Sequence, residues 1–133
     1  MQDVFIVRFI IEYLQKTNPP IKWRLDETSG KFIGRLYNKD EAIGLVLGRI
    51  EYRGIISYAL DVSTESEGLI SIEASQTADR FFQKHKDENS RELVESLASL
   101  FKVIAEQYLQ KKKIDSENEE ERRQAIYKKI ISI

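Results

Sequence analysis

The sequence contains no cysteine, one histidine, one methionine and two prolines among its 133 residues. Without cysteine the chain can form no disulfide, and it lacks thiolate nucleophiles and the usual ligands of a structural zinc site. The lone His85 lies between Lys84 and Lys86, which is typical of a solvated surface residue, and no nucleophile and base set can be assembled. We therefore expect no catalytic residue, no metal ion, no cofactor and a reducing cytoplasm as the location.

Long apolar runs are also missing. The segment 4–14 is apolar but is interrupted by Arg8 and Glu12, and it has neither a basic leader nor a small-residue cleavage site. These features predict a core helix rather than a signal peptide or a membrane span. We accordingly expect no membrane partner.

Composition indicates one folded domain with a heavily charged surface. Hydrophobic residues make up 41% of the chain and charged residues 32%, whereas disordered chains have too little apolar content to offset chain entropy. A length of 133 residues fits a single core. The high usage of Glu, Lys, Arg and Ile resembles that of thermophile proteins.

Charge is unevenly distributed along the chain, although the net charge is only −1. Residues 1–113 are neutral. The following eight residues carry five negative charges, at Asp115, Glu117, Glu119, Glu120 and Glu121. The last twelve carry four positive charges, at Arg122, Arg123, Lys128 and Lys129. This pattern predicts a single α+β domain over 1–113 and a distinct charged tail helix over 114–133.

Periodicity predicts the order of the elements. A largely buried N-terminal helix ends before the two prolines, and period-two alternation then follows to about residue 74. The alternation and its turn signals predict five strands: 21–26, 31–37, 42–52, 55–63 and 69–74. The short connections favour an antiparallel meander.

Capping signals predict the remaining helices. Ser75 can open a short helix that reaches about Lys86, and Asn89 with Glu92 can open a longer one. Ser116 begins a further capping box for the tail helix. The expected fold class is α+β: an N-terminal helix, a five-stranded antiparallel meander sheet, two covering helices and a C-terminal tail helix.

One sheet face is predicted to be basic and to carry an aromatic ring, because cations alternate with apolar residues on the first strands. Cations can replace phosphate counterions, and rings stack on bases without regard to sequence, so this face is a candidate surface for single-stranded DNA or RNA. The alternative is an ordinary solvated sheet face. Trp23 is expected to anchor the core rather than to stack on a base. The candidate binding residues are Lys22, Arg24, Lys31, Arg35, Tyr37, Arg49 and Arg53.

Four carboxylates gather around one expected turn: Asp61, Glu65, Glu67 and Glu73. Their spacing and glycine placement differ from those of a calcium loop. A solvated turn is favoured over a cation site.

The tail carries an apolar stripe with nothing local to pack on, made of Ile126, Tyr127, Ile130 and Ile131. A body already supplied with covering helices leaves this stripe free for a second subunit. We therefore expect a homo-oligomer, with folding back onto the same core as the alternative.

Part of the chain resembles a known arrangement of elements. This part consists of the segment 58–62, a short turn, the segments 68–75 and 76–81, and the long helix. The order of these elements, over residues 54–113, is similar to small single-stranded DNA-binding proteins of archaea and their viruses, the ThermoDBP-like group, and more loosely to Pur-type repeats. The resemblance implies a curved sheet that binds the strand and subunits that pair through C-terminal helices. It also implies that the acidic segment 116–121 can compete for the DNA site.

A protein-binding module is the competing class. The same elements resemble secretion-chaperone and YbjN-like folds, which hold protein segments on apolar patches and strand edges. A virus or plasmid accessory protein that inhibits a host factor is a third possibility. Cations and rings on the outer face of strands one to three favour nucleic acid, and apolar grooves there favour a peptide.

Overall fold

A computed structural model describes residues 2–18, 21–76 and 88–133. The elements run in the order α1 (Gln2–Lys16), β1 (Arg24–Asp26), β2 (Lys31–Asn38), β3 (Glu41–Tyr52), β4 (Ile55–Thr64), β5 (Gly68–Gln76) and α2 (Glu88–Ile131). The strands form one sheet in sequence order, and every neighbouring pair is antiparallel. The predicted α+β fold with a five-stranded antiparallel meander is confirmed.

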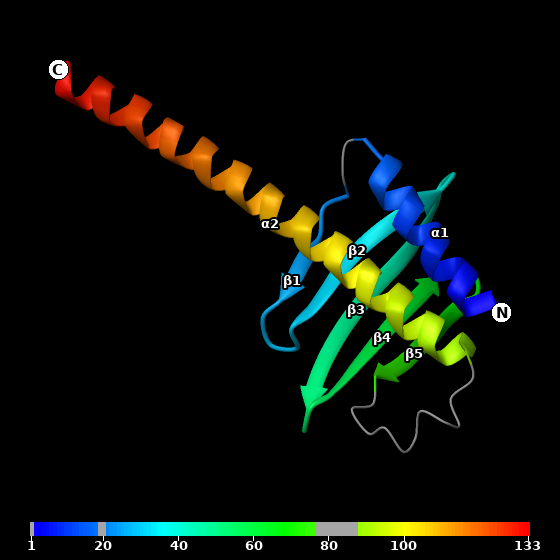
Figure 1. The fold of residues 1–133 in the computed structure, drawn as a ribbon. Coiled ribbons are helices and arrows are strands. Elements are labelled where there is room, and N and C mark those ends of the chain that lie inside the picture. Colours follow the sequence, from blue (N-terminus) through cyan, green and yellow to red (C-terminus); the bar gives the residue numbers. More distant parts are fainter. Residues whose placement is uncertain (1, 19–20, 77–87) are drawn as a thin grey trace.

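Both helices lie across the same face of the sheet (Figure 1). The register aligns Phe32, Leu47, Leu60 and Ile72 across four strands, and all four side chains are buried beneath the helices. On α2 the leucine and isoleucine side chains at positions 97, 100 and 104 are fully buried against them. This packing makes a two-layer domain in which no described element covers the other sheet face, which we call the open face.

The first strand is shorter than predicted. Only Arg24–Asp26 pairs with β2, and residues 21–23 run outside the ladder. Trp23 turns into the core instead, where it is 7% exposed and its indole Nε1 donates a 3.0 Å hydrogen bond to Gln107 Oε1 on α2. A contact with a distant helix therefore decides where β1 begins, and Trp23 is confirmed as a core anchor.

The predicted short helix from Ser75 does not begin there, because Ser75 and Gln76 continue β5 opposite Ser57 and Ile56. The rest of that prediction, His85 included, falls outside the described residues.

The predicted separate tail helix is instead the continuation of α2, which runs unbroken from Glu88 to Ile131. Ser116 lies inside this helix rather than at its start. The sequence of α2 contains neither glycine nor proline, and ion pairs within the helix support it on both sides of Ser116. They join Lys111 to Asp115 at 3.4 Å and Arg122 to Glu119 at 3.2 Å. A capping signal without a helix breaker before it does not end a helix.

Gly34 is required by the position of Trp23. A Cβ atom added at Gly34 would lie 2.5 Å from Cζ3 and 2.6 Å from Cε3 of the indole ring. The ring therefore covers the β2 backbone directly.

We predict that Gly34→Ala lowers the free energy of unfolding by about 1–3 kcal/mol, because the added methyl group overpacks the indole. Urea unfolding followed by tryptophan fluorescence measures the change. Gly48→Ala is the matched control, since its Cβ would meet only the flexible stem of Lys31, at 3.2 Å or more. Equal destabilisation by the two variants would contradict the proposed contact.

Candidate nucleic-acid interface

Strand register separates the predicted binding residues by sheet face. Because Phe32 and Leu36 face the helices, Lys31, Arg35 and Tyr37 on the same strand face the open side. Arg24 pairs with Ile33 and shares that side. The open face of β1 and β2 is therefore basic, as the alternation predicted.

Four of the predicted residues line one groove: Lys22, Arg24, Arg35 and Tyr37. The groove lies at the β1–β2 edge, where the end of α1 contributes Tyr13 and Thr17 to its wall. Apolar side chains at positions 21, 33 and 36 also line it. Tyr37 is 62% exposed, so its ring is free to stack on a flat ligand. We call this feature the edge groove.

Arg49 does not join the edge groove. It pairs across the sheet with Tyr58, which is buried among the core residues, so its side chain lies on the helix-covered side. Its guanidinium is 3.5 Å from the carboxylate of Glu51. The strand is paired on both sides of Gly48 without a bulge. This regular pairing places the Arg49 side chain on the other sheet face from Lys31.

Arg53 is held apart in the tight turn between β3 and β4. Its φ is 51° and that of Gly54 is 77°, the pair of positive values that a two-residue hairpin turn requires. The guanidinium carbon lies 5.2 Å from the centre of the Tyr52 ring. Arg53 is nine positions beyond Gly44, the partner of Arg35, which corresponds to roughly 30 Å along a strand.

The open face also carries an acidic half that the sequence interpretation did not identify. Asp61 on β4 pairs with Ser71 on β5, and the Ser71 hydroxyl donates a 2.7 Å hydrogen bond to Asp61 Oδ1. Glu73 lies on the same side, 3.5 Å from the same hydroxyl. Alternation along β4 and β5 was the available signal, but these carboxylates were assigned to a turn. The open face is thus cationic on β1–β2 and anionic on β4–β5.

Small residues separate the two halves. Gly44, Gly48 and Ala59 lie on the open side between the cations of β2 and the carboxylates of β4, with Val46 between the two glycines. The Ser63 hydroxyl lies close to Gly44, and the stem of Lys31 lies close to Gly48.

The outer edge of β2 is partly unpaired. The β1 ladder ends at Ile33, so within the described part of the chain residues 34–38 pair only with β3. This edge borders the edge groove and offers backbone hydrogen-bonding groups to a ligand.

The β1–β2 turn is held by Asp26. Ser29 Oγ donates a 2.9 Å hydrogen bond to Asp26 Oδ2, and the backbone N–H of Thr28 donates to Oδ1 at 3.1 Å. These two interactions hold the pKa of Asp26 below its ordinary value of 3.8, the Ser29 hydroxyl contributing most. The turn positions Arg24 at one end and Lys31 at the other.

We predict that Ser29→Ala raises the pKa of Asp26 toward 3.8, because the largest stabiliser of the carboxylate is lost. A depressed aspartate pKa contributes stability that is present above about pH 3.8 and is lost as pH falls through the folded-state value. Carboxyl ¹³C NMR titration measures the pKa. Ser66→Ala, which removes a hydrogen bond to Glu41 instead, should leave it unchanged, and an unaltered Asp26 in Ser29→Ala would refute the assignment.

Beyond the body, α2 continues as a projecting helix that we call the arm, residues 109–131 (Figure 1). Every arm residue is exposed except Glu119, which is half-buried. The predicted oligomerisation residues lie at its end, with Ile126 48%, Tyr127 50%, Ile130 58% and Ile131 84% exposed. Because the helix is continuous, the apolar end cannot fold back onto its own core, which excludes the alternative considered from the sequence.

The described residues contain no group of three or more histidine, aspartate or glutamate side chains placed to hold a metal ion. Neither helix, over its described length, carries an apolar stretch long enough to cross a bilayer.

Comparison with known proteins gives no relative: no family model, curated protein or solved structure matches the chain.

Proposed function

We propose that the protein binds single-stranded DNA or RNA, without catalysis and with little sequence preference, along the β1–β2 half of its open sheet face. The observation that carries this proposal is the edge groove, which is lined by Lys22, Arg24 and Arg35 together with the exposed ring of Tyr37. None of these three cations forms an ion pair with a carboxylate of the described residues. They are available to replace the counterions of a phosphate backbone.

Charge on the rest of the face defines the path of the strand. Asp61 and Glu73 repel phosphates from β4 and β5, so the strand follows β2 between Lys31 and Tyr37, with Gly44 and Gly48 beside it. These residues span about 20 Å. Stacking on Tyr37 does not depend on which base is present, and this is the reason for weak sequence preference.

We predict that changing Arg24 and Arg35 together to Ala weakens binding and flattens the slope of log affinity against log salt by about 1.4, since each phosphate contact to a single strand contributes about 0.7. Fluorescence anisotropy of a labelled oligonucleotide of about twenty bases, titrated at several salt concentrations, gives the slope. Arg49→Ala is the matched control, because Arg49 lies on the other face, and it should change neither quantity. Failure of both single and double strands to bind below about 100 µM would remove the proposal.

We predict a different loss for Tyr37→Ala: about 1–3 kcal/mol of binding free energy with the salt slope unchanged, because the ring contributes stacking and no charge. The same anisotropy titrations separate the two effects. Tyr52→Ala, an equally exposed ring in the β3–β4 hairpin, should bind as the unmodified protein does. A Tyr52 effect as large as that of Tyr37 would move the path of the strand away from the edge groove.

A protein partner is the second candidate, favoured by the unpaired edge of β2. An extended peptide could add a strand beside residues 34–38, and the neighbouring cations would select an acidic one. If oligonucleotides do not bind and acidic peptides do, this candidate replaces the first.

We also propose that the protein is a homo-oligomer paired through its C-terminal helix. The arm exposes Ile126, Tyr127, Ile130 and Ile131 to solvent, and exposed apolar stripes of this kind are typical of interaction surfaces.

We predict that a chain ending at Lys113 is a monomer and that the full chain is not, because the truncation removes the apolar end of the arm. Light scattering over a range of concentrations measures both masses. Ile126→Asp with Ile130→Asp should reproduce the effect of truncation in a full-length chain. A full-length chain that stays monomeric at every concentration would contradict this proposal.

A further inference from the structure

One face of the arm carries a heptad pattern that runs from the body to the end of the chain. Positions spaced alternately by three and four residues lie on one side of a helix. Along the arm these positions are Leu109, Lys112, Ser116, Glu119, Arg123, Ile126 and Ile130, and Ile133 follows just beyond the end of α2. The series is apolar at both ends and polar in the middle.

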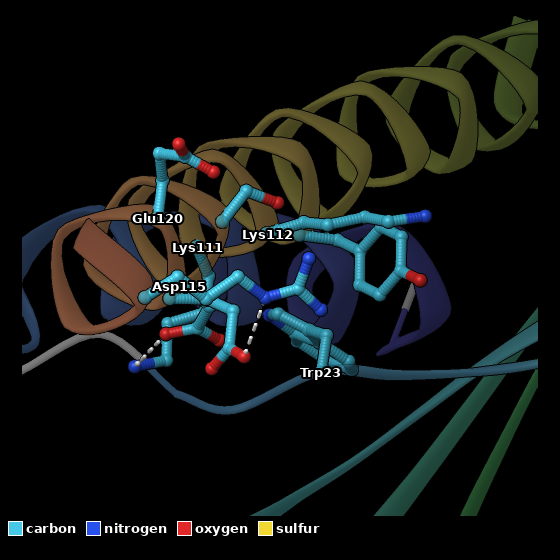
Figure 2. Close-up of a pocket in the computed structure, with 9 residues that line it drawn as sticks. Trp23, Lys111, Lys112, Asp115 and Glu120 are labelled. Carbon is cyan, nitrogen blue, oxygen red and sulfur yellow. Dashed lines mark hydrogen bonds and ion pairs between the residues drawn. The ribbon is translucent and has the colours of Figure 1, made fainter. Parts of the chain in front are cut away.

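The same face borders an uncovered groove where the arm leaves the body. Four of the heptad positions line this groove: Lys112, Ser116, Glu119 and Arg123. Trp23 lies at the end of the groove toward the body (Figure 2). We call it the arm groove. The apolar end of the arm lies on the same side of the helix, but helix continuity keeps it from reaching the arm groove of its own chain.

From this placement we infer that two arms pair antiparallel, with the apolar end of each lying in the arm groove of the other. The inference rests on the proposed pairing through the C-terminal helix and specifies its geometry. The two-fold axis lies near Glu121. The facing pairs are then Leu109 with Ile133 of the partner subunit, Lys112 with the partner's Ile130, Ser116 with the partner's Ile126, and Glu119 with the partner's Arg123.

Charge decides between the two possible orientations. A parallel pair in register would place Lys112, Glu119 and Arg123 each opposite its own copy, so three layers would oppose like charges. The antiparallel pair replaces these contacts with two Glu119–Arg123 pairs between subunits. Within one chain Arg123 Nε already lies 3.3 Å from Glu119 Oε1, so both groups are placed on the face that would meet the partner. Polar residues at core positions fix orientation at a cost in stability, and the dimer should therefore be concentration-dependent.

The remaining layers fit the antiparallel register. Ser116 is small enough to admit the branched side chain of Ile126, and the methylene stem of Lys112 can cover Ile130 while its ammonium group stays in water. The overlap from residue 109 to residue 133 covers more than three heptads, about 36 Å of helix. The two bodies then lie at opposite ends of the paired arms.

We predict that disulfide trapping reports this orientation without background, because the chain contains no cysteine. The full-length variants Ser116→Cys and Ile126→Cys are made separately, one with an affinity tag, and are then mixed and oxidised. Antiparallel pairing gives a covalent heterodimer in the mixture and no cross-linked Ser116→Cys homodimer. Parallel pairing gives the reverse. A dimer that forms the Ser116→Cys homodimer, or that forms no cross-link in the mixture, overturns this inference and leaves the proposed oligomer standing.

Charge reversal supplies an independent readout. We expect Glu119→Arg or Arg123→Glu alone to weaken dimerisation about tenfold, equivalent to about 1.4 kcal/mol, and the double variant to restore it. Sedimentation equilibrium measures the dissociation constants. A double variant no tighter than the single ones overturns the antiparallel register. A chain that is monomeric throughout overturns the proposed oligomer as well.

Discussion

The packing of α2 on the sheet determines the remaining features of this protein. Leu97, Leu100 and Ile104 are fully buried against Leu47 and Leu60, and this contact leaves the opposite face of the sheet open. Because α2 is one unbroken helix, the same contact sets the direction in which the arm leaves the body (Figure 1). Both proposed surfaces, the edge groove and the arm groove, follow from it.

A small polar connection joins the three segments that meet beside these grooves. Gln107 on α2 accepts a hydrogen bond from the Trp23 indole and donates one of 3.1 Å to the backbone carbonyl of Leu14 at the end of α1. The indole in turn covers Gly34. Loss of any member should loosen the junction of α1, β1 and α2, because a buried donor or acceptor left unpaired costs more than the bond itself contributes.

Continuity of α2 also bears on the acidic segment of the tail. An acidic tail competes for a binding site within its own chain only if it can reach that site. Here the carboxylates at 115–121 are fixed on a rigid helix that projects from the body, and some are already paired, as Glu119 is with Arg122 and Arg123. In the antiparallel pair proposed above, they would lie beside the basic end of the partner's arm.

Local patterns in the sequence determined most of the fold. Period-two alternation and turn residues place β2 to β5 within two residues of their observed bounds, since each pattern depends on neighbours in the chain. The basic face of β1 and β2 and the apolar end of the tail follow in the same way. Tertiary structure alone decided the rest. The start of β1 depends on a tryptophan that contacts a helix more than eighty residues away, and the placement of Arg49 depends on a ladder that passes Gly48 without a bulge. The arm groove arises where Trp23 meets α2, segments distant in sequence, so no local pattern contains it.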